Sequence, residues 1–187
     1  MKKTTWNLTL SAMFLAVGMV LPFLTGQVPQ IGNMLLPMHL PVFLCGLICG
    51  APYGAAVGFV LPILRSFVFG MPIMYPAAIA MAFELAAYGL LAGYLYNSSK
   101  WQCIISLYRS LIIAMIGGRL VWGAVQIVLL GIGGNGFTWQ MFLSGALLQA
   151  VPGIILQLIF IPLIMVLLHR TGLVKFQRHV KEEATGF

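Results

Sequence analysis

Charged residues are scarce in this sequence. Only 7% of its 187 residues are Asp, Glu, Lys or Arg, and just three are acidic, whereas a soluble domain carries about 25% charged residues. Hydrophobic residues make up 61% instead, and the mean hydropathy is +1.02. A soluble fold of this size cannot bury so much apolar surface, but a lipid bilayer solvates it. The composition therefore predicts an integral membrane protein.

The motifs of common enzymes are also missing. The sequence contains neither an H-E-x-x-H zinc motif nor a Walker A phosphate-binding motif. Its three cysteines are Cys45, Cys49 and Cys103. The first two share one helix face in an apolar run with no further metal ligands nearby, so packing is the expected role. We expect no enzymatic activity, no cofactor, no bound metal and no disulfide framework.

Six apolar segments are separated by short stretches rich in glycine, proline and asparagine. A helix needs roughly 20 apolar residues to cross a bilayer. The pattern predicts an all-α bundle of six transmembrane helices in a single domain that covers residues 1–187. A short basic tail is expected from about residue 169. The predicted spans are residues 6–24, 37–50, 53–69, 75–96, 104–130 and 142–168.

Lysine and arginine outside the spans are concentrated at the two ends of the chain and around the loop between the fourth and fifth spans. The loops at 25–36, 70–74 and 131–138 contain none. Basic residues mark the cytoplasmic side of a membrane protein. With six spans the three basic regions share one side, so both termini are predicted to be cytoplasmic. The net charge of +7 thus indicates membrane anchoring rather than nucleic-acid binding.

Four ionisable residues interrupt the predicted spans, namely His39, Arg65, Glu84 and Arg119. Such residues are costly in a bilayer and usually face the bundle interior at a functional site. At about 1.5 Å per residue, all four lie in the outer half or near the midplane, which predicts a cavity that opens outward. Glu84 can neutralise only one arginine, and the sequence leaves open which one. We predict one polar cluster with an excess positive charge that attracts an anion; the alternative is a purely structural interhelical pair.

Other polar and aromatic residues are candidates to line the same cavity. Gln126 follows Arg119 by seven residues and so shares its helix face. Aromatic residues at these positions have an alternative role as anchors at the membrane interface. The additional candidates for substrate contact are Asn33, Tyr75, Trp122, Gln126 and Gln149.

The first predicted span carries a separate signal. Ala12 and Ala16 form a small-x-x-x-small pair, with Ser11 and Gly18 nearby. This spacing allows another membrane helix to approach closely. Six spans are few for a self-sufficient carrier, so the chain is expected to be a subunit that offers this surface to a partner.

These segments resemble the substrate-binding subunits, or S components, of energy-coupling factor (ECF) vitamin transporters. The similarity covers nearly the whole chain and is carried by AMFLA at 12–16, LPMHLP at 36–41 and AMAFE at 80–84. The resemblance implies a vitamin pocket that faces outward, with residues 25–36 and 70–75 as its gate. It also implies docking through Ala12 and Ala16 onto an ECF transmembrane coupling subunit, which works with two cytoplasmic ATPase subunits.

The leading hypothesis is therefore the binding subunit of an ATP-driven vitamin importer in the bacterial cytoplasmic membrane. Pantothenate is the first candidate because it is a monoanion and the predicted cavity has one arginine in excess. Folate, cobalamin and riboflavin remain open. A stand-alone proton-coupled carrier that uses Glu84 is one rival, and a structural or assembly factor without a ligand is another.

Overall fold

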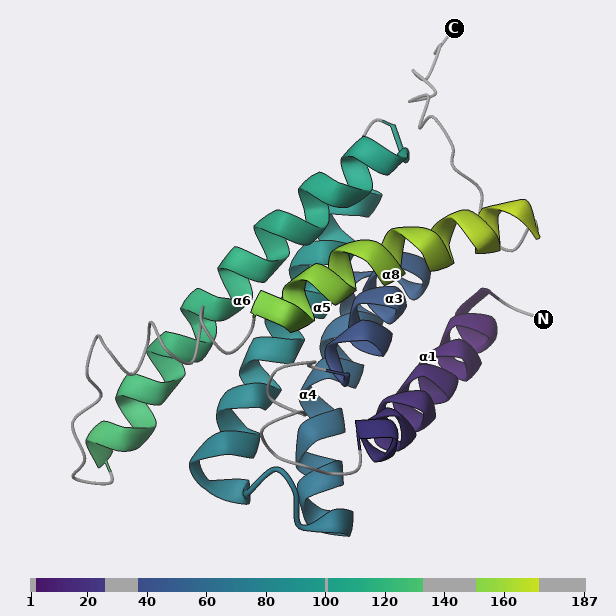
Figure 1. Cartoon of the computed structure of the whole chain (residues 1–187). Helices are drawn as coiled ribbons and strands as arrows, with labels where there is room; N and C mark the ends of the chain where they lie inside the picture. Colours follow the sequence, from purple (N-terminus) through teal and green to yellow (C-terminus); the bar gives the residue numbers. More distant parts are fainter. Residues whose placement is uncertain (1–2, 26–36, 100, 133–150, 172–187) are drawn as a thin grey trace, which may run out of the picture.

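The computed structural model describes residues 3–25, 37–99, 101–132 and 151–171. All regular elements in these ranges are helical (Figure 1), which agrees with the predicted all-α class. They are α1 (Lys3–Val20), the 3-10 helix η1 (Leu21–Thr25), α3 (His39–Cys49), α4 (Ala51–Phe69), the wide turn η2 (Met74–Ala78), α5 (Ile79–Asn97), α6 (Ile104–Ile132) and α8 (Val151–Arg170).

Five of the described helices are long and apolar enough to cross a membrane. The sixth, α3, has 11 residues and is therefore about 16 Å long, roughly half of the hydrocarbon core. The predicted count of six full spans is thus not reached within the described ranges. The first span was expected to end at residue 24, and the apolar helical segment indeed runs from Lys3 to Phe23. Within it, the α-helix ends at Val20 and continues as the 3-10 helix that contains Pro22. Residues 142–150 of the last predicted span lie outside the described residues.

Helices α3, α4 and α5 pack with their backbones in contact at glycines. A Cβ atom added at Gly89 of α5 would lie 2.3 Å from the backbone of Gly54 in α4, and one added at Gly58 would lie 2.3 Å from the carbonyl oxygen of Leu85. Gly46 of α3 approaches α5 almost as closely, since its added Cβ would lie 2.4 Å from the carbonyl oxygen of Gly89. These contacts fix the register of α4 and α5, with residues 54 and 58 opposite 89 and 85.

Helix α6 runs along the other side of α5. A Cβ atom at Gly118 would lie 2.3 Å from the ring of Tyr88, so the missing side chain makes room for that ring against the α6 backbone. Helix α8 crosses obliquely in front of α3 and α5 (Figure 1) and buries Ile161 and Met165 in the shared apolar core. Helix α5 is therefore covered by α3, α4 and α6 and lies at the centre of the bundle.

A small polar seam holds α1 against α3. Asn7 Nδ2 donates a hydrogen bond to the carbonyl oxygen of Cys49 at 3.2 Å. The hydroxyl of Ser11 donates a hydrogen bond to the carbonyl oxygen of Asn7 at 2.7 Å. It also accepts a hydrogen bond from the thiol of Cys45 at 3.5 Å. Both α3 cysteines are buried and free, as the sequence predicted for packing residues. Because Ser11 faces inward, the opposite face of α1 points away from the bundle.

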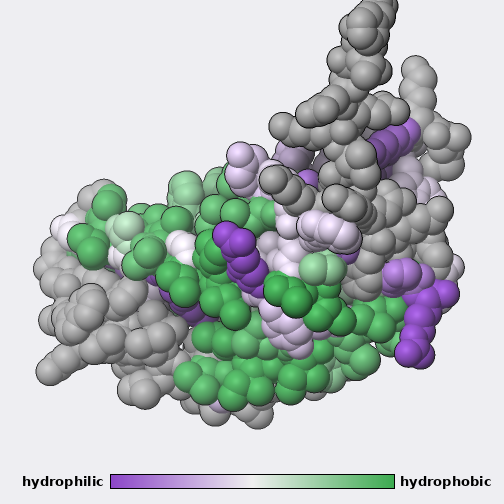
Figure 2. Space-filling model, turned by 90° about the horizontal axis from the view of Figure 1, so that it is seen from above, coloured by the Kyte–Doolittle hydropathy of each residue, from purple (hydrophilic) through white to green (hydrophobic). Residues whose placement is uncertain are grey.

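The outer surface is that of a membrane protein. Viewed from above Figure 1, hydrophobic side chains cover most of the visible described surface, and hydrophilic residues are confined to small areas (Figure 2). Large apolar side chains such as Phe67 and Ile105 are among the most exposed in the molecule. Surfaces of this kind are stable when lipid replaces water around them.

Candidate functional site

A buried ion pair joins α5 and α6 in the interior of the bundle. Arg119 Nη1 of α6 lies 2.8 Å from Glu84 Oε1 of α5. Glu84 is only 2% exposed, so it requires a partner inside the apolar bundle. The structure thus resolves the pairing that the sequence left open: Glu84 pairs with Arg119.

Two aromatic residues complete the surroundings of the Glu84 carboxylate. One turn further along α5, the hydroxyl of Tyr88 donates a hydrogen bond to Glu84 Oε1 at 2.8 Å. The imidazole Nε2 of His39 lies 3.9 Å from the same oxygen, and its ring lies 5.3 Å from the Tyr88 ring between centroids. His39 is the first residue of α3. The short helix α3 therefore begins beside the carboxylate, deep in the bundle.

Arg65 does not belong to this cluster, and the expectation of a single cluster with both arginines is corrected. Its Nη1 donates a hydrogen bond to the carbonyl oxygen of Met19, where α1 ends. Its guanidinium carbon lies 5.2 Å from the Phe23 ring centroid and 5.3 Å from that of Phe69. Arg65 is 3% exposed, so a carbonyl and two aromatic faces replace the acidic partner.

The α4–α5 register explains this separation. Gly58 lies opposite Leu85 and Gly54 opposite Gly89, so Arg65 lies opposite position 78, six residues before Glu84. At 1.5 Å per residue this is about 9 Å along the axis, too far for a direct ion pair. The depths expected from the sequence placed both arginines in the outer half or near the midplane, but helix register decides which one Glu84 reaches.

Several other candidates lie along one buried stripe of α6. Arg119 and Gln126 are two helical turns apart on this stripe, and the partly buried Trp122 lies between them. The hydroxyl of Tyr75, which precedes α5, donates a hydrogen bond to the carbonyl oxygen of Leu129 further along α6. The structure thus joins Arg119 to α5 and Tyr75 to α6, and Trp122 and Gln126 lie between these two contacts along α6.

Polar atoms on this stripe are buried without hydrogen-bond partners among the described residues. They are Nε and Nη2 of Arg119 and Oε1 of Gln126. Burying such groups costs free energy, and unpaired examples in a native structure require an explanation. A polar ligand would pair with them.

Sequence reasoning missed two polar residues. Tyr88 follows Glu84 by four residues, so the helical period alone was enough to place its hydroxyl near the carboxylate. Gln157 of α8 is an amide in an otherwise apolar run; it is 1% exposed, and its Nε2 has no hydrogen-bond partner among the described residues. Two predicted site residues, Asn33 and Gln149, lie outside the described residues.

The remaining predictions concern docking and metal binding. Ala12 and Ala16 are exposed on the face of α1 that points away from α3. Within the part of the chain that the structure describes, no group of three or more histidine, cysteine or acidic side chains has the arrangement of a metal site.

The family model described as "ECF transporter, substrate-specific component" matches residues 7–165. The chain belongs to this family. Neither the curated proteins nor the solved structures yield a match. The matched range contains the Glu84–Arg119 pair, the stripe on α6 and the exposed alanines of α1, so all of these features belong to the substrate-specific subunit of a membrane transporter.

Proposed function

We propose that this chain binds a B-type vitamin at the Glu84–Arg119 pair and delivers it to an ATP-driven ECF importer. The observation that carries the proposal is the unpaired edge of the Arg119 guanidinium. Glu84 engages Nη1, whereas Nε and Nη2 are buried with no hydrogen-bond partner among the described residues. Family membership supports the transport role, and the unpaired edge of Arg119 supports the location of the binding site.

The unpaired edge suggests a carboxylate ligand. Nε–H and Nη2–H point in parallel along one side of the guanidinium plane, which is the geometry that receives two carboxylate oxygens at once. Pantothenate, a monocarboxylate, therefore remains the first candidate. Its support is now the donor geometry of Arg119, because Arg65 is engaged elsewhere and supplies no excess charge. Riboflavin, folate and cobalamin are the alternatives to be tested beside it.

The partner surface in this proposal is the exposed face of α1. Ala12 and Ala16 lie one turn apart on that face, so the helix of a transmembrane coupling subunit can approach the α1 backbone there. The coupling subunit would link the chain to two cytoplasmic ATPase subunits. The hydrogen bonds of Asn7 and Ser11 to α3 support this assignment, because they fix which face of α1 points away from the bundle.

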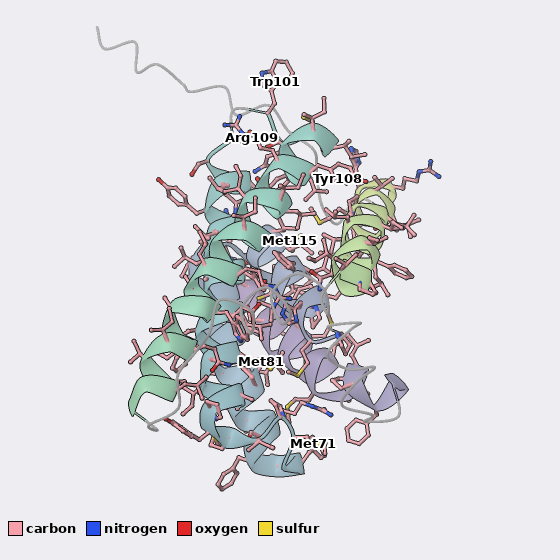
Figure 3. All side chains as sticks on the ribbon, turned by 60° about the vertical axis from the view of Figure 1, so that its left-hand side comes forward. Met71, Met81, Trp101, Tyr108, Arg109 and Met115 are labelled. Atoms are coloured by element: carbon pink, nitrogen blue, oxygen red, sulfur yellow. The ribbon has the colours of Figure 1, made fainter. Side chains whose placement is uncertain are left out.

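We further propose a bacterial cytoplasmic membrane location with both termini on the cytoplasmic side. Trp101 and Arg109 lie at one end of the bundle and Met71 lies at the opposite end (Figure 3). The end with Arg109 follows the basic loop region, and the described loop at 70–73 has no lysine or arginine. The positive-inside rule then assigns the Arg109 end to the cytoplasm.

The rival proposal of a proton-coupled carrier fits the geometry less well. Such a carrier would use Glu84 to take up and release protons. Here Arg119 and Tyr88 both engage Glu84 Oε1, an arrangement that stabilises the ionised carboxylate. Transport in vesicles that contain the purified chain without ATPase subunits would favour the proton-coupled carrier instead.

The test of the binding site is calorimetry on the purified chain in lipid nanodiscs, with pantothenate, riboflavin, folate and cobalamin as probes. Mass spectrometry of co-purified small molecules provides an independent identification. The key variant is Arg119→Lys, which keeps the charge but loses the planar edge, and the matched control is Arg65→Lys. We expect Arg119→Lys to weaken binding about tenfold to a hundredfold, as for loss of a charged hydrogen bond. Equal losses in both variants would contradict the assignment of the site to Arg119.

Docking requires a separate test. Ala12→Leu and Ala16→Leu should retain vitamin binding but lose co-purification with the coupling subunit, since bulk on this face blocks helix approach. Ala124→Leu places the same bulk on an exposed position of α6 and should change neither property. Normal co-purification of both α1 variants would reject the docking surface.

A further inference from the structure

Gln126 has a buried acceptor that the ion pair does not use. The residue is 8% exposed, and its Oε1 has no hydrogen-bond partner among the described residues. An unpaired buried acceptor costs about 1–3 kcal/mol. A substrate group that donates a hydrogen bond would relieve this cost.

The spacing of Gln126 and Arg119 along α6 sets the distance that a ligand must span to reach both side chains. Seven residues of α-helix make almost two full turns, so the two side chains leave α6 in nearly the same direction, about 10 Å apart along the axis. Gly123 is also buried on this face, whereas Leu120, Ala124 and Ile127 are exposed on the other. Both unpaired groups therefore belong to the face that α6 turns toward the bundle.

The surroundings of the stripe are suited to an extended molecule. Trp122 lies between the two polar side chains along the helix and offers an apolar surface. The Tyr75–Leu129 hydrogen bond closes the η2 side of the α6–α5 interface just beyond Gln126.

From these observations we infer that the substrate is an elongated monocarboxylate with a hydroxyl or amide N–H group at its far end. The carboxylate binds Nε and Nη2 of Arg119, and the distal donor binds Gln126 Oε1 about two helical turns away. This inference rests on the proposed function and narrows it, because it makes Gln126 a specificity-determining residue. Compact ligands, and long ligands without a distal donor, leave one of the two groups unpaired.

The experiment combines two ligands with two variants of the full chain in nanodiscs. The ligands are pantothenate, which has hydroxyl groups at the end opposite its carboxylate, and its analogue without those hydroxyls. Gln126→Met keeps the side-chain length but removes the acceptor. We expect it to weaken pantothenate binding about tenfold and to leave the affinity for the deoxy analogue unchanged. Arg119→Lys should weaken the binding of both ligands to the same extent.

Its outcomes separate the inference from the proposed function. If pantothenate binds but Gln126→Met changes the affinities for both ligands equally, or changes neither, the inference is wrong and the vitamin site stands. If another vitamin co-purifies, the same variant is measured on it; a ligand with no carboxylate, or with no distal donor, overturns the inference. If no vitamin binds to the folded chain, the proposed function itself fails and the inference fails with it.

Discussion

The Glu84–Arg119 ion pair gives the most informative prediction. Arg119→Met and Glu84→Leu replace each charge with an apolar side chain of similar size. Either change alone leaves a buried charge without its partner, at a cost of about 3–5 kcal/mol in the free energy of unfolding. The cost should be smaller for Glu84→Leu, because Arg119 is 12% exposed whereas Glu84 is 2% exposed. The double variant removes both charges and leaves mainly the Tyr88 hydroxyl unpaired, at about 1–3 kcal/mol.

The double-mutant cycle is measured by equilibrium unfolding in mixed micelles, with vitamin binding in nanodiscs as a second readout. The double variant should be more stable than either single variant and still fail to bind, because Arg119 is needed for the ligand. Arg65→Met combined with Glu84→Leu is the control, since those sites share no contact and their effects should add within about 0.5 kcal/mol. Simple additivity in the Glu84–Arg119 cycle would refute the pairing that the structure shows.

Three further predictions concern single elements. Arg65→Met should lower the free energy of unfolding by about 1–3 kcal/mol through loss of its carbonyl and aromatic contacts, with vitamin affinity by calorimetry unchanged. Gly58→Ala should destabilise the bundle by about 1–3 kcal/mol or more because its Cβ meets backbone of the facing helix, whereas Gly131→Ala, which meets nothing within 4 Å, should be neutral. An impermeant thiol reagent should label Ile73→Cys in intact cells and Ser98→Cys only after permeabilisation; the reverse pattern would invert the proposed topology.

The fold was largely predictable because a bilayer imposes strong constraints on sequence. Apolar runs of about 20 residues can only be helices in lipid, and the predicted third, fourth and fifth spans match α4, α5 and α6 within a few residues. The ends were harder to predict. Val20 and Leu21 are equally apolar, but α1 ends between them, and hydropathy does not report such a change in helix geometry. The second predicted span, residues 37–50, was by contrast already short, and α3 (His39–Cys49) agrees with it within two residues at each end.

The candidate site was predicted in composition but not in connectivity. Because ionisable side chains are costly in a bilayer, His39, Glu84 and Arg119 were expected in the bundle interior, and the structure places them next to one another. The same argument included Arg65, because it counts charges and depths but contains no information on helix register. Register here depends on the close backbone contacts at Gly58 and Gly89, which counts of charge and depth do not reveal. An arginine can also be accommodated without an acid, and the two phenylalanines beside Arg65 belong to different helical elements, so no local pattern predicts that they meet.

The position of Arg65 supports the docking face proposed on α1. Its guanidinium holds the carbonyl of Met19 and lies against Phe23, so it fixes the end of α1 that is opposite the polar seam of Asn7 and Ser11. Helix α1 is thereby held at both ends, with Ala12 and Ala16 facing outward between them. A partner helix that displaces α1 must therefore break the Arg65 contacts as well as the polar seam, so Arg65 contributes to the stability of the proposed docking face.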